Sequence, residues 1–291
     1  MGMDACTLCP RMCGVNRAAG EKGYCGMDAT IRAARAALHM WEEPCISGTQ
    51  GSGAVFFSGC SLRCIFCQNF EIAEGNCAKE ISGERLSEIF LELQEQGAAN
   101  INLVTAAHYV PAVIESLKKA KAQGMDLPVV YNSSGYEKLE TLKLLEGYVD
   151  IYLPDLKYME PDLAQKFSHA PDYVERAKAA IKEMVRQSGS CQFGEDGYIR
   201  RGTIVRHLIL PGHTKNSRKV LRYLHETYGE EIYISIMNQY TPVREFGEFK
   251  ELNRKVTKRE YEKVLDTAVE MGIQNGFIQE GETASESFIP E

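Results

Sequence analysis

Short apolar runs alternate with longer amphipathic stretches along most of this 291-residue chain. The runs are rich in Val, Ile, Tyr and Phe, and Gly, Pro, Asn or Asp bounds each of them, which is typical of buried strands. They cover residues 54–59, 101–105, 128–132, 150–155, 205–210 and 233–238. The stretches between them carry one apolar face and predict helices over residues 83–97, 110–124, 137–147, 172–189, 216–229 and 257–272.

Six strand-then-helix units in a row predict a parallel sheet with right-handed crossovers. A full barrel of this kind has eight units, so six indicate an α/β fold of the incomplete (β/α)6 TIM-like barrel type. A doubly wound open sheet is the alternative. In both architectures ligands bind at the carboxyl ends of the strands. That rule selects Thr105, Asn132, Asp155 and Asn238, together with the segment that follows the first strand.

The first fifty residues have a different character, because they are rich in Cys and Gly and hold only one helix candidate, residues 28–41. A segment this short rarely buries enough apolar surface to fold without a bound metal or a covalent cross-link. We therefore expect a Cys-rich, metal-binding N-terminal extension over residues 1–50 and a barrel over residues 51–291.

Composition excludes several classes of protein. Hydrophobic residues make up 44% and charged residues 25%, an ordinary globular balance, and the net charge of −7 gives no electrostatic footprint for nucleic acid. No apolar run approaches the ~20 residues of a membrane helix, and the N-terminus lacks the apolar centre of a signal peptide. We expect a cytoplasmic protein. Its ten cysteines would stay reduced there, so metal ligation explains them better than disulfides do.

Three of these cysteines, Cys60, Cys64 and Cys67, fall within the stretch "GCSLRCIFCQNF". Iron–sulfur clusters normally take four cysteine ligands, so a cluster held by three has one iron free for another ligand. A zinc site with a distant fourth ligand is the alternative. The apolar neighbours Ile65 and Phe66 favour a sheltered redox cluster over an exposed zinc knuckle.

The Cys-x3-Cys-x2-Cys spacing, with an aromatic residue before the third cysteine and a strand before the first, resembles the radical S-adenosylmethionine (SAM) superfamily. The resemblance implies an enzyme of the oxidoreductase type with a [4Fe–4S] cluster on Cys60, Cys64 and Cys67. The open iron would chelate SAM, and an electron would cleave SAM to methionine and a 5′-deoxyadenosyl radical that abstracts hydrogen. It also implies a reductant such as flavodoxin or ferredoxin.

Further segments are similar to the pyruvate formate-lyase activating enzymes. The "FCQN" segment would place Phe66 and Asn69 at the adenine of SAM. "DIYLPDLKY" would place Asp155 and Lys157 at SAM, and "RHLILPG" makes Arg206 a candidate contact of its carboxylate. The N-terminal "CTLCPRMCG" and "GYCG" look like the branch of activating-enzyme-like iron–sulfur proteins with no assigned substrate.

The chain departs from those enzymes at two strand ends. They carry Gly-Gly-Glu after the second strand, where this chain has "VTAAHYVP". Thr105 can still offer backbone groups to SAM, and His108 stands near the position of the missing Glu. "YNSSG" replaces a turn that contains Asp, which leaves hydroxyl and amide groups for a ribose. The remaining candidates for cofactor binding are Asn132, Ser133, Ser134 and Asn238.

Cys6, Cys9, Cys13 and Cys25 form a second group, with two, three and eleven residues between them. Four ligands close a site, and both structural zinc and an additional [4Fe–4S] cluster fit the spacing. A segment that binds no metal is the third possibility.

The resulting hypothesis is a radical SAM enzyme that abstracts hydrogen from a protein or a small molecule. Activation of a glycyl-radical enzyme is one option, and it needs a partner whose peptide loop reaches the radical. The alternative is a non-enzymatic iron–sulfur or zinc protein, such as an electron carrier or a sensor. Polar residues at the strand ends, including Asn69, Asn132 and Asp155, argue against a carrier, which needs no pocket.

Overall fold

Parallel strands form the centre of the sheet in the computed structural model, which describes residues 3–279. Each of these strands pairs with the next one along the chain. They are β2 (Ser52–Phe57), β4 (Ile101–Val104), β5 (Val129–Ser133), β6 (Ile151–Pro154), β8 (Ile199–Leu208), β9 (Tyr233–Met237) and β10 (Gly276–Ile278).

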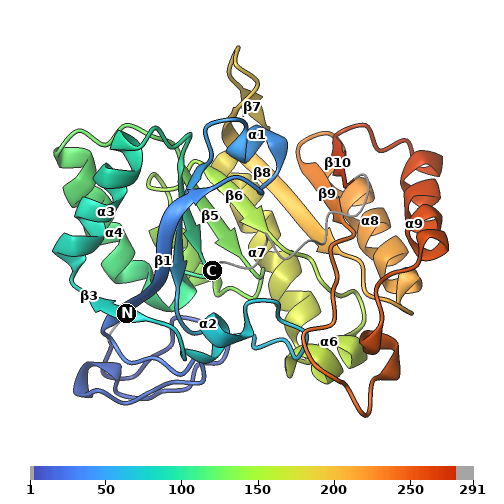
Figure 1. The fold of residues 1–291 in the computed structure, drawn as a ribbon, viewed down its shortest axis with the longest axis horizontal. Helices are drawn as coiled ribbons and strands as arrows, with labels where there is room; N and C mark the ends of the chain where they lie inside the picture. Colours follow the sequence, from blue (N-terminus) through green and yellow to red (C-terminus); the bar gives the residue numbers. More distant parts are fainter. Residues whose placement is uncertain (1–2, 280–291) are drawn as a thin grey trace.

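Helices follow most of these strands and cover the outside of the sheet (Figure 1). On one side α3 packs against α4, and on the other α8 packs against α9. The helices are α1 (Pro44–Ser47), α2 (Phe70–Glu74), α3 (Gly83–Glu95), α4 (Val110–Ala122), α5 (Leu139–Leu144), α6 (Pro161–Ser168), α7 (Tyr173–Ser188), α8 (Thr214–Tyr228) and α9 (Lys258–Glu270).

The strand order excludes the doubly wound alternative. The order β2-β4-β5-β6-β8-β9-β10 follows the chain without a reversal, whereas a doubly wound sheet reverses at a switch point. Within residues 3–279 the two ends of the sheet do not pair, so the barrel is incomplete, as predicted. The prediction missed β10, a seventh parallel strand, because Gly276–Ile278 is too short to give a pattern of its own.

The helix expected at residues 28–41 is wrong, because this segment forms β1 (Ile31–His39). Its Ala and Arg residues favour a helix, but β1 pairs antiparallel with β2 from Ala33 to His39 and with β3 (Lys79–Ile81) at its start. Tertiary pairing thus overrides local propensity. The predicted division at residue 50 stays a prediction, and its outer limits, residues 1 and 291, lie outside the described residues. A single sheet nevertheless runs through both predicted parts.

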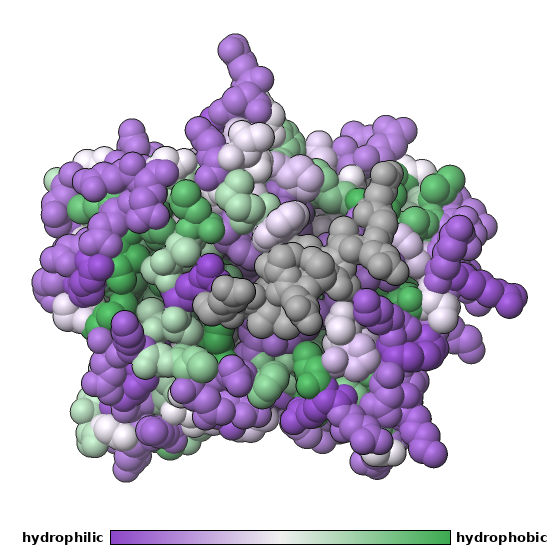
Figure 2. All heavy atoms as spheres, viewed as in Figure 1, coloured by the Kyte–Doolittle hydropathy of each residue, from purple (hydrophilic) through white to green (hydrophobic). Residues whose placement is uncertain are grey.

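Apolar side chains fill the space between the sheet and its helices. One cluster joins β2, β4 and β5 to α3 and α4, and another joins β8 and β9 to α6, α7, α8 and α9. Hydrophilic residues cover most of the outer helices on the face drawn in Figure 2. Among the described residues, no helix combines the length and apolar character that crossing a bilayer requires.

Candidate active site

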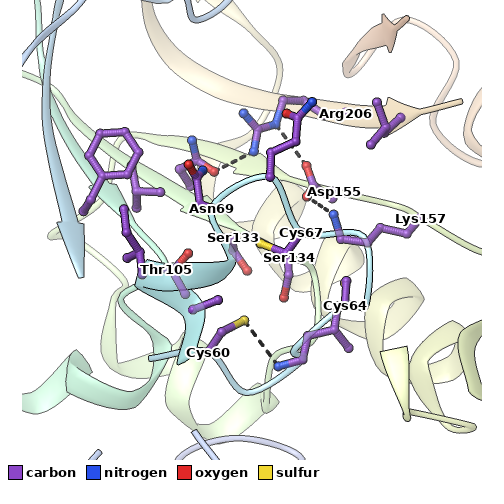
Figure 3. Close-up of a pocket in the computed structure, with 18 of the residues that line it drawn as sticks. Cys60, Cys64, Cys67, Asn69, Thr105, Ser133, Ser134, Asp155, Lys157 and Arg206 are labelled. Atoms are coloured by element: carbon purple, nitrogen blue, oxygen red, sulfur yellow. Dashed lines mark hydrogen bonds and ion pairs between the residues drawn. The ribbon is translucent and has the colours of Figure 1, made fainter. Parts of the chain in front are cut away.

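A cavity of about 250 Å³ opens at the carboxyl ends of the parallel strands, where the fold predicts ligand binding. Figure 3 shows the cysteine loop on one wall and the polar strand ends on the other. Of the residues selected from the sequence, twelve line it: Cys60, Cys64, Phe66, Cys67, Asn69, Thr105, Asn132, Ser133, Ser134, Asp155, Lys157 and Arg206.

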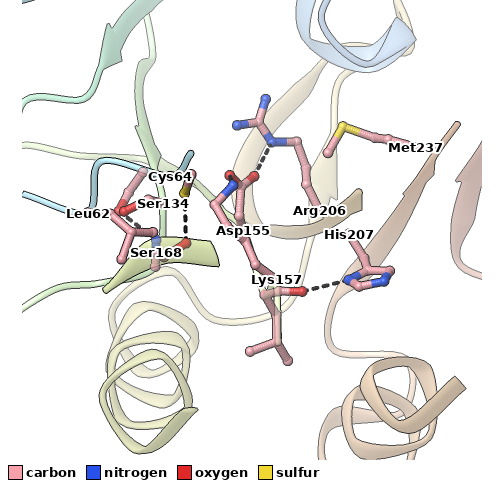
Figure 4. Close-up of polar contacts among 12 residues, drawn as sticks. Leu62, Cys64, Ser134, Asp155, Lys157, Ser168, Arg206, His207 and Met237 are labelled. Atoms are coloured by element: carbon pink, nitrogen blue, oxygen red, sulfur yellow. Dashed lines mark hydrogen bonds and ion pairs between the residues drawn. The ribbon is translucent and has the colours of Figure 1, made fainter. Parts of the chain in front are cut away.

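The three cysteines lie on a loop that the rest of the protein holds from several sides. The Leu62 N–H donates to Cys60 Sγ at 3.4 Å, and the Ser168 hydroxyl donates to Cys64 Sγ at 3.0 Å (Figure 4). The Cys67 N–H closes a turn onto the Cys64 carbonyl at 3.1 Å. Burial raises the pKa of Cys67 to about 12, so without a metal or cluster this thiol stays protonated at neutral pH.

Gly59 turns the chain from β2 into this loop with a φ of 86°. A Cβ atom there would lie 2.4 Å from Met27 Cγ and 2.8 Å from the Cys25 carbonyl oxygen. Both contacts are shorter than real Cβ contacts, so only glycine fits. The cysteine loop therefore begins packed directly against the N-terminal segment.

Behind the loop, four charged side chains with 8–15% of their surface exposed form one network. Asp155 Oδ1 accepts from Arg206 Nε at 3.0 Å, and Asp155 Oδ2 accepts from Lys157 Nζ at 2.5 Å. Arg206 Nη1 donates to Glu42 Oε2 at 3.1 Å, and Arg206 Nη2 donates to Asn132 Oδ1 at 2.6 Å. Two cations and two carboxylates sum to no net charge, which is what makes their burial tolerable.

The pKa directions agree with this balance. Burial favours neutral Asp155, but Lys157 and Arg206 outweigh it, and the pKa of Asp155 is lowered. Burial alone would lower the pKa of Lys157 and of Arg206. Asp155 and the Cys64 thiol raise the pKa of Lys157, and Asp155 with Glu42 raises that of Arg206. Asp155, Lys157 and Arg206 therefore carry charge at neutral pH.

Thr105 ends β4 in a conformation that favours glycine, with a φ of 61°. A β-branched residue there is strained by about 1–3 kcal/mol. The Thr105 N–H donates to the Asn132 carbonyl at 2.9 Å, which helps to hold this conformation. The strand end that lacks Gly-Gly-Glu thus still has a glycine-like backbone at the wall of the cavity.

The other candidates on the cavity wall differ in how firmly they are held. Phe66 packs edge-on against Phe167 and Tyr240. The Ser133 hydroxyl donates to Glu137, and the Ser134 carbonyl accepts from Tyr173 Oη at 2.9 Å. In contrast, the Asn69 side chain forms no hydrogen bond within the described part of the chain and keeps its donors and acceptor available.

Two candidates do not line the cavity. His108 is buried, with Nε2 2.8 Å from the Ser58 carbonyl oxygen, and burial lowers its pKa to about 3. It therefore supports the turn before Gly59 as a neutral side chain. Asn238 also lies away from the cavity, because Met237 and Gln239 on either side of it line the wall. Neighbours along an extended chain point in opposite directions.

The cavity also includes residues that the sequence reading missed, above all Glu42 and Trp41. They follow β1, but the helix wrongly predicted over residues 28–41 gave no reason to place them at the end of a strand. Glu42 accepts from the side-chain amides of Asn102 at 3.1 Å and Asn132 at 3.0 Å, besides Arg206. The adjacent acidic pair in "WEEP" was the available signal, since two carboxylates beside an apolar strand need partners.

The family model of the radical SAM superfamily matches residues 54–224, more than half of the chain. The chain belongs to the radical SAM superfamily. It is also similar to the "Uncharacterized protein MJ0674" of Methanocaldococcus jannaschii, at 27% identity over 90% of this chain and 74% of that one.

Two solved structures share the fold at low sequence identity. One is a radical SAM methyltransferase from Sphaerobacter thermophilus, with a TM-score of 0.54 and 15% identity over 80% of this chain and 69% of the other. The second is Streptococcus suis SuiB bound to the precursor peptide SuiA, with a TM-score of 0.50 and 12% identity over 76% of this chain. This chain spans 46% of the length of SuiB.

Membership in the superfamily implies a [4Fe–4S] cluster and SAM. The donor set fits, because three thiols on one loop face a cavity that also holds a charged and polar wall. Within residues 3–279, no group of three or more His, Cys, Asp or Glu side chains already stands in metal-binding geometry.

Proposed function

We propose that this protein is an enzyme that cleaves SAM reductively and uses the 5′-deoxyadenosyl radical to abstract hydrogen from a substrate. The observation that carries the proposal is one cavity lined both by Cys60, Cys64 and Cys67 and by an ordered polar wall. When bound, the cluster supplies one electron that breaks the S–C5′ bond of SAM, releasing methionine and the radical. The abstracted hydrogen atom leaves as part of 5′-deoxyadenosine.

The chain's own residues have distinct parts in this proposal. Asn69, whose side chain is unengaged, contacts the adenine beside the fixed ring of Phe66. Ser134 and Lys157 contact the ribose or the carboxylate of SAM. Arg206 has its charge balanced by Asp155 and Glu42. It therefore serves mainly to position the wall, with its remaining N–H groups available to the SAM carboxylate.

Glycyl-radical activation is the finer form of the proposal. The segments similar to pyruvate formate-lyase activating enzymes support it, and a peptide is also the ligand in the SuiB structure. Trp41 lines the cavity with 56% of its surface exposed, so its ring is accessible to a substrate segment at the cavity edge. A partner enzyme would show a glycyl-radical signal by electron paramagnetic resonance after incubation with the protein, SAM and a reductant. A small-molecule substrate would leave that partner silent.

The central test is SAM cleavage by anaerobically reconstituted protein with dithionite, followed by chromatography of 5′-deoxyadenosine. We expect cleavage by the natural sequence and none by Cys64→Ala. Cys77→Ala is the matched control, because Cys77 is exposed and outside the cavity. Circular dichroism checks that both variants fold. Cleavage that survives Cys64→Ala contradicts the proposal, and absence of SAM binding by cluster-loaded protein favours an electron carrier or sensor.

A further inference from the structure

The four N-terminal cysteines converge although up to eleven residues separate neighbours in the sequence. Cys6, Cys9 and Cys25 are buried, Cys13 is exposed, and all four are free thiols. A Cβ atom on Gly23 would lie 3.0 Å from Cys13 Sγ and 3.7 Å from Cys25 Sγ, so both thiols lie next to Gly23 and close to each other. Cys6 and Cys9 each lie within electrostatic range of Cys25.

Backbone hydrogen bonds fold this segment into tight turns around the thiols. The Cys6 N–H donates to the Val15 carbonyl at 2.9 Å, and the Gly14 N–H returns to the Cys6 carbonyl at 3.0 Å. The Met12 N–H donates to the Cys9 carbonyl at 3.0 Å. The turns keep Cys6, Cys9 and Cys13 together without any disulfide. Within residues 3–279 these thiols do not already stand in metal-binding geometry, so ligation by this set would require them to reorient.

Arg17 next to this set provides an independent observation. Its side chain is 1% exposed, and its guanidinium donates to the carbonyls of Asp28 at 3.1 Å and His108 at 2.6 Å. Within residues 3–279 it forms no ion pair with a carboxylate; its guanidinium also lies 5.5 Å from the centre of the Tyr109 ring and 3.8 Å from Cys6 Sγ. A buried cation without a counter-charge is costly. Thiolates at Cys6 and its neighbours would supply that charge.

The same segment supports the cysteine loop of the cavity. Arg11 Nε donates to the Ser61 carbonyl at 2.9 Å, and Arg11 Nη2 donates to the Ser168 carbonyl at 3.1 Å. The Cys25 carbonyl is also among the groups that force glycine at position 59. Figure 1 shows the N-terminal segment, in dark blue, at the same end of the molecule as α2. The N-terminal segment therefore contacts the loop of Cys60 and Cys64 directly, and the conformation of this loop depends on that segment being folded.

We propose that Cys6, Cys9, Cys13 and Cys25 bind one Zn²⁺ ion in a closed tetrahedral site that holds the N-terminal segment in shape. Each thiol releases one proton on binding, and four thiolates with Zn²⁺ carry a net charge of −2, which Arg17 offsets in part. Four protein ligands leave no open position, so the site is structural. Its ligands lie outside the cavity, and the bound ion takes no part in the chemistry of SAM cleavage.

The test measures bound metal in protein in which Cys60, Cys64 and Cys67 are all replaced by Ala, so that the cavity cysteines hold none. Purified from cells supplied with zinc and iron, this protein is expected to retain one zinc per chain by plasma emission spectrometry. Adding Cys13→Ser should abolish the zinc, and since Cys13 is exposed, this change opens no gap in the core. Cys77→Ser, at another exposed thiol, should leave the zinc in place.

Stability gives a second readout that does not depend on radical chemistry. A strong chelator should lower the Tm of the zinc-retaining protein and leave the Tm of the Cys13→Ser variant unchanged. Iron with acid-labile sulfide in place of zinc would overturn the assignment of a single ion. Protein without metal, or zinc that survives Cys13→Ser, would overturn the site itself.

Discussion

Replacing Glu42 with Gln tests the claim that the cavity wall depends on a balanced buried network. Glu42 has 8% and Arg206 15% of the side chain exposed, and their closest atoms are 3.1 Å apart. Gln keeps an oxygen for Asn102 and Asn132 but removes the charge. Asp155 is then the one carboxylate hydrogen-bonded to Arg206 and Lys157, and the nearby Glu43, whose pKa burial raises, compensates only in part. Removing one partner of a buried pair costs about 3–5 kcal/mol. Because the amide contacts are retained, we expect the loss of unfolding free energy to lie at the lower end of this range, about 3 kcal/mol.

Chemical denaturation of the natural sequence and of Glu42→Gln measures this change as a difference in unfolding free energy. At roughly 2–4 °C per kcal/mol for a chain of this size class, the Tm should fall by about 6–12 °C. Glu80→Gln is the matched control, because Glu80 pairs with Arg32 but is 66% exposed. An exposed pair contributes about 0–1 kcal/mol, so the control should change little.

A double-mutant cycle with Arg206→Met separates the pair from other effects of the substitution. Without Arg206, Glu42 is a buried carboxylate with no cation partner, and Glu42→Gln should then be neutral or stabilising. Equal destabilisation in both backgrounds would refute the ion-pair argument. A loss in Glu42→Gln no larger than that of Glu80→Gln would refute it as well.

Three further changes test single features. Burial lowers the pKa of His207 to about 4, below its ordinary 6.5, so the unfolded chain binds a proton first as pH falls. Stability is then full above pH 6.5 and falls by about 3 kcal/mol toward pH 4. His207→Gln should remove most of this fall when the free energy of unfolding is measured against pH, and a fall that persists in the variant would show that another group causes it. Thr105→Gly should raise the unfolding free energy by about 1 kcal/mol, because released strain exceeds the entropic cost of Gly, whereas Thr49→Gly, where φ is not positive, should lower it. Ser168→Ala removes the hydroxyl donor to Cys64 Sγ and should lower the reduction potential of the reconstituted cluster in a spectroelectrochemical titration, since hydrogen bonds to ligand sulfur favour the reduced state. An unchanged potential, matching that of Ser87→Ala, would show that Ser168 does not act on the cluster.

The sequence pattern was sufficient for the parallel core because each buried strand carries its own apolar run between turn residues. The strand ends followed from that, which is why Asn132 and Asp155 could be selected from the pattern alone. The assignment of Lys157 and Arg206 to the same site rested on the resemblance of their segments to known strands. All four line the cavity.

What the pattern missed depends on pairing between distant segments. The local sequence of β1 predicts a helix, and only its pairing with β2 makes it a strand. The role of Glu42 likewise depends on its contact with Arg206, which is distant in the sequence. His108 was placed at the cavity because position along the chain suggested it, although its ring turns instead toward Ser58. Tertiary packing sets the direction of a side chain after a strand end, and the hydrophobic periodicity of the local sequence does not predict it.

The ion pair between Glu42 and Arg206 also has a consequence for the order of folding. Its two residues are 164 positions apart, so the pair forms only after the intervening strands have been made and placed. Contacts of such long range form slowly, because chain closure costs entropy before the contact is gained. During synthesis, Glu42 leaves the ribosome long before Arg206 and lacks this cation partner until β8 arrives. The cavity wall is therefore among the last parts of the molecule to form, and a truncated chain that ends before β8 would have a sheet without a finished site.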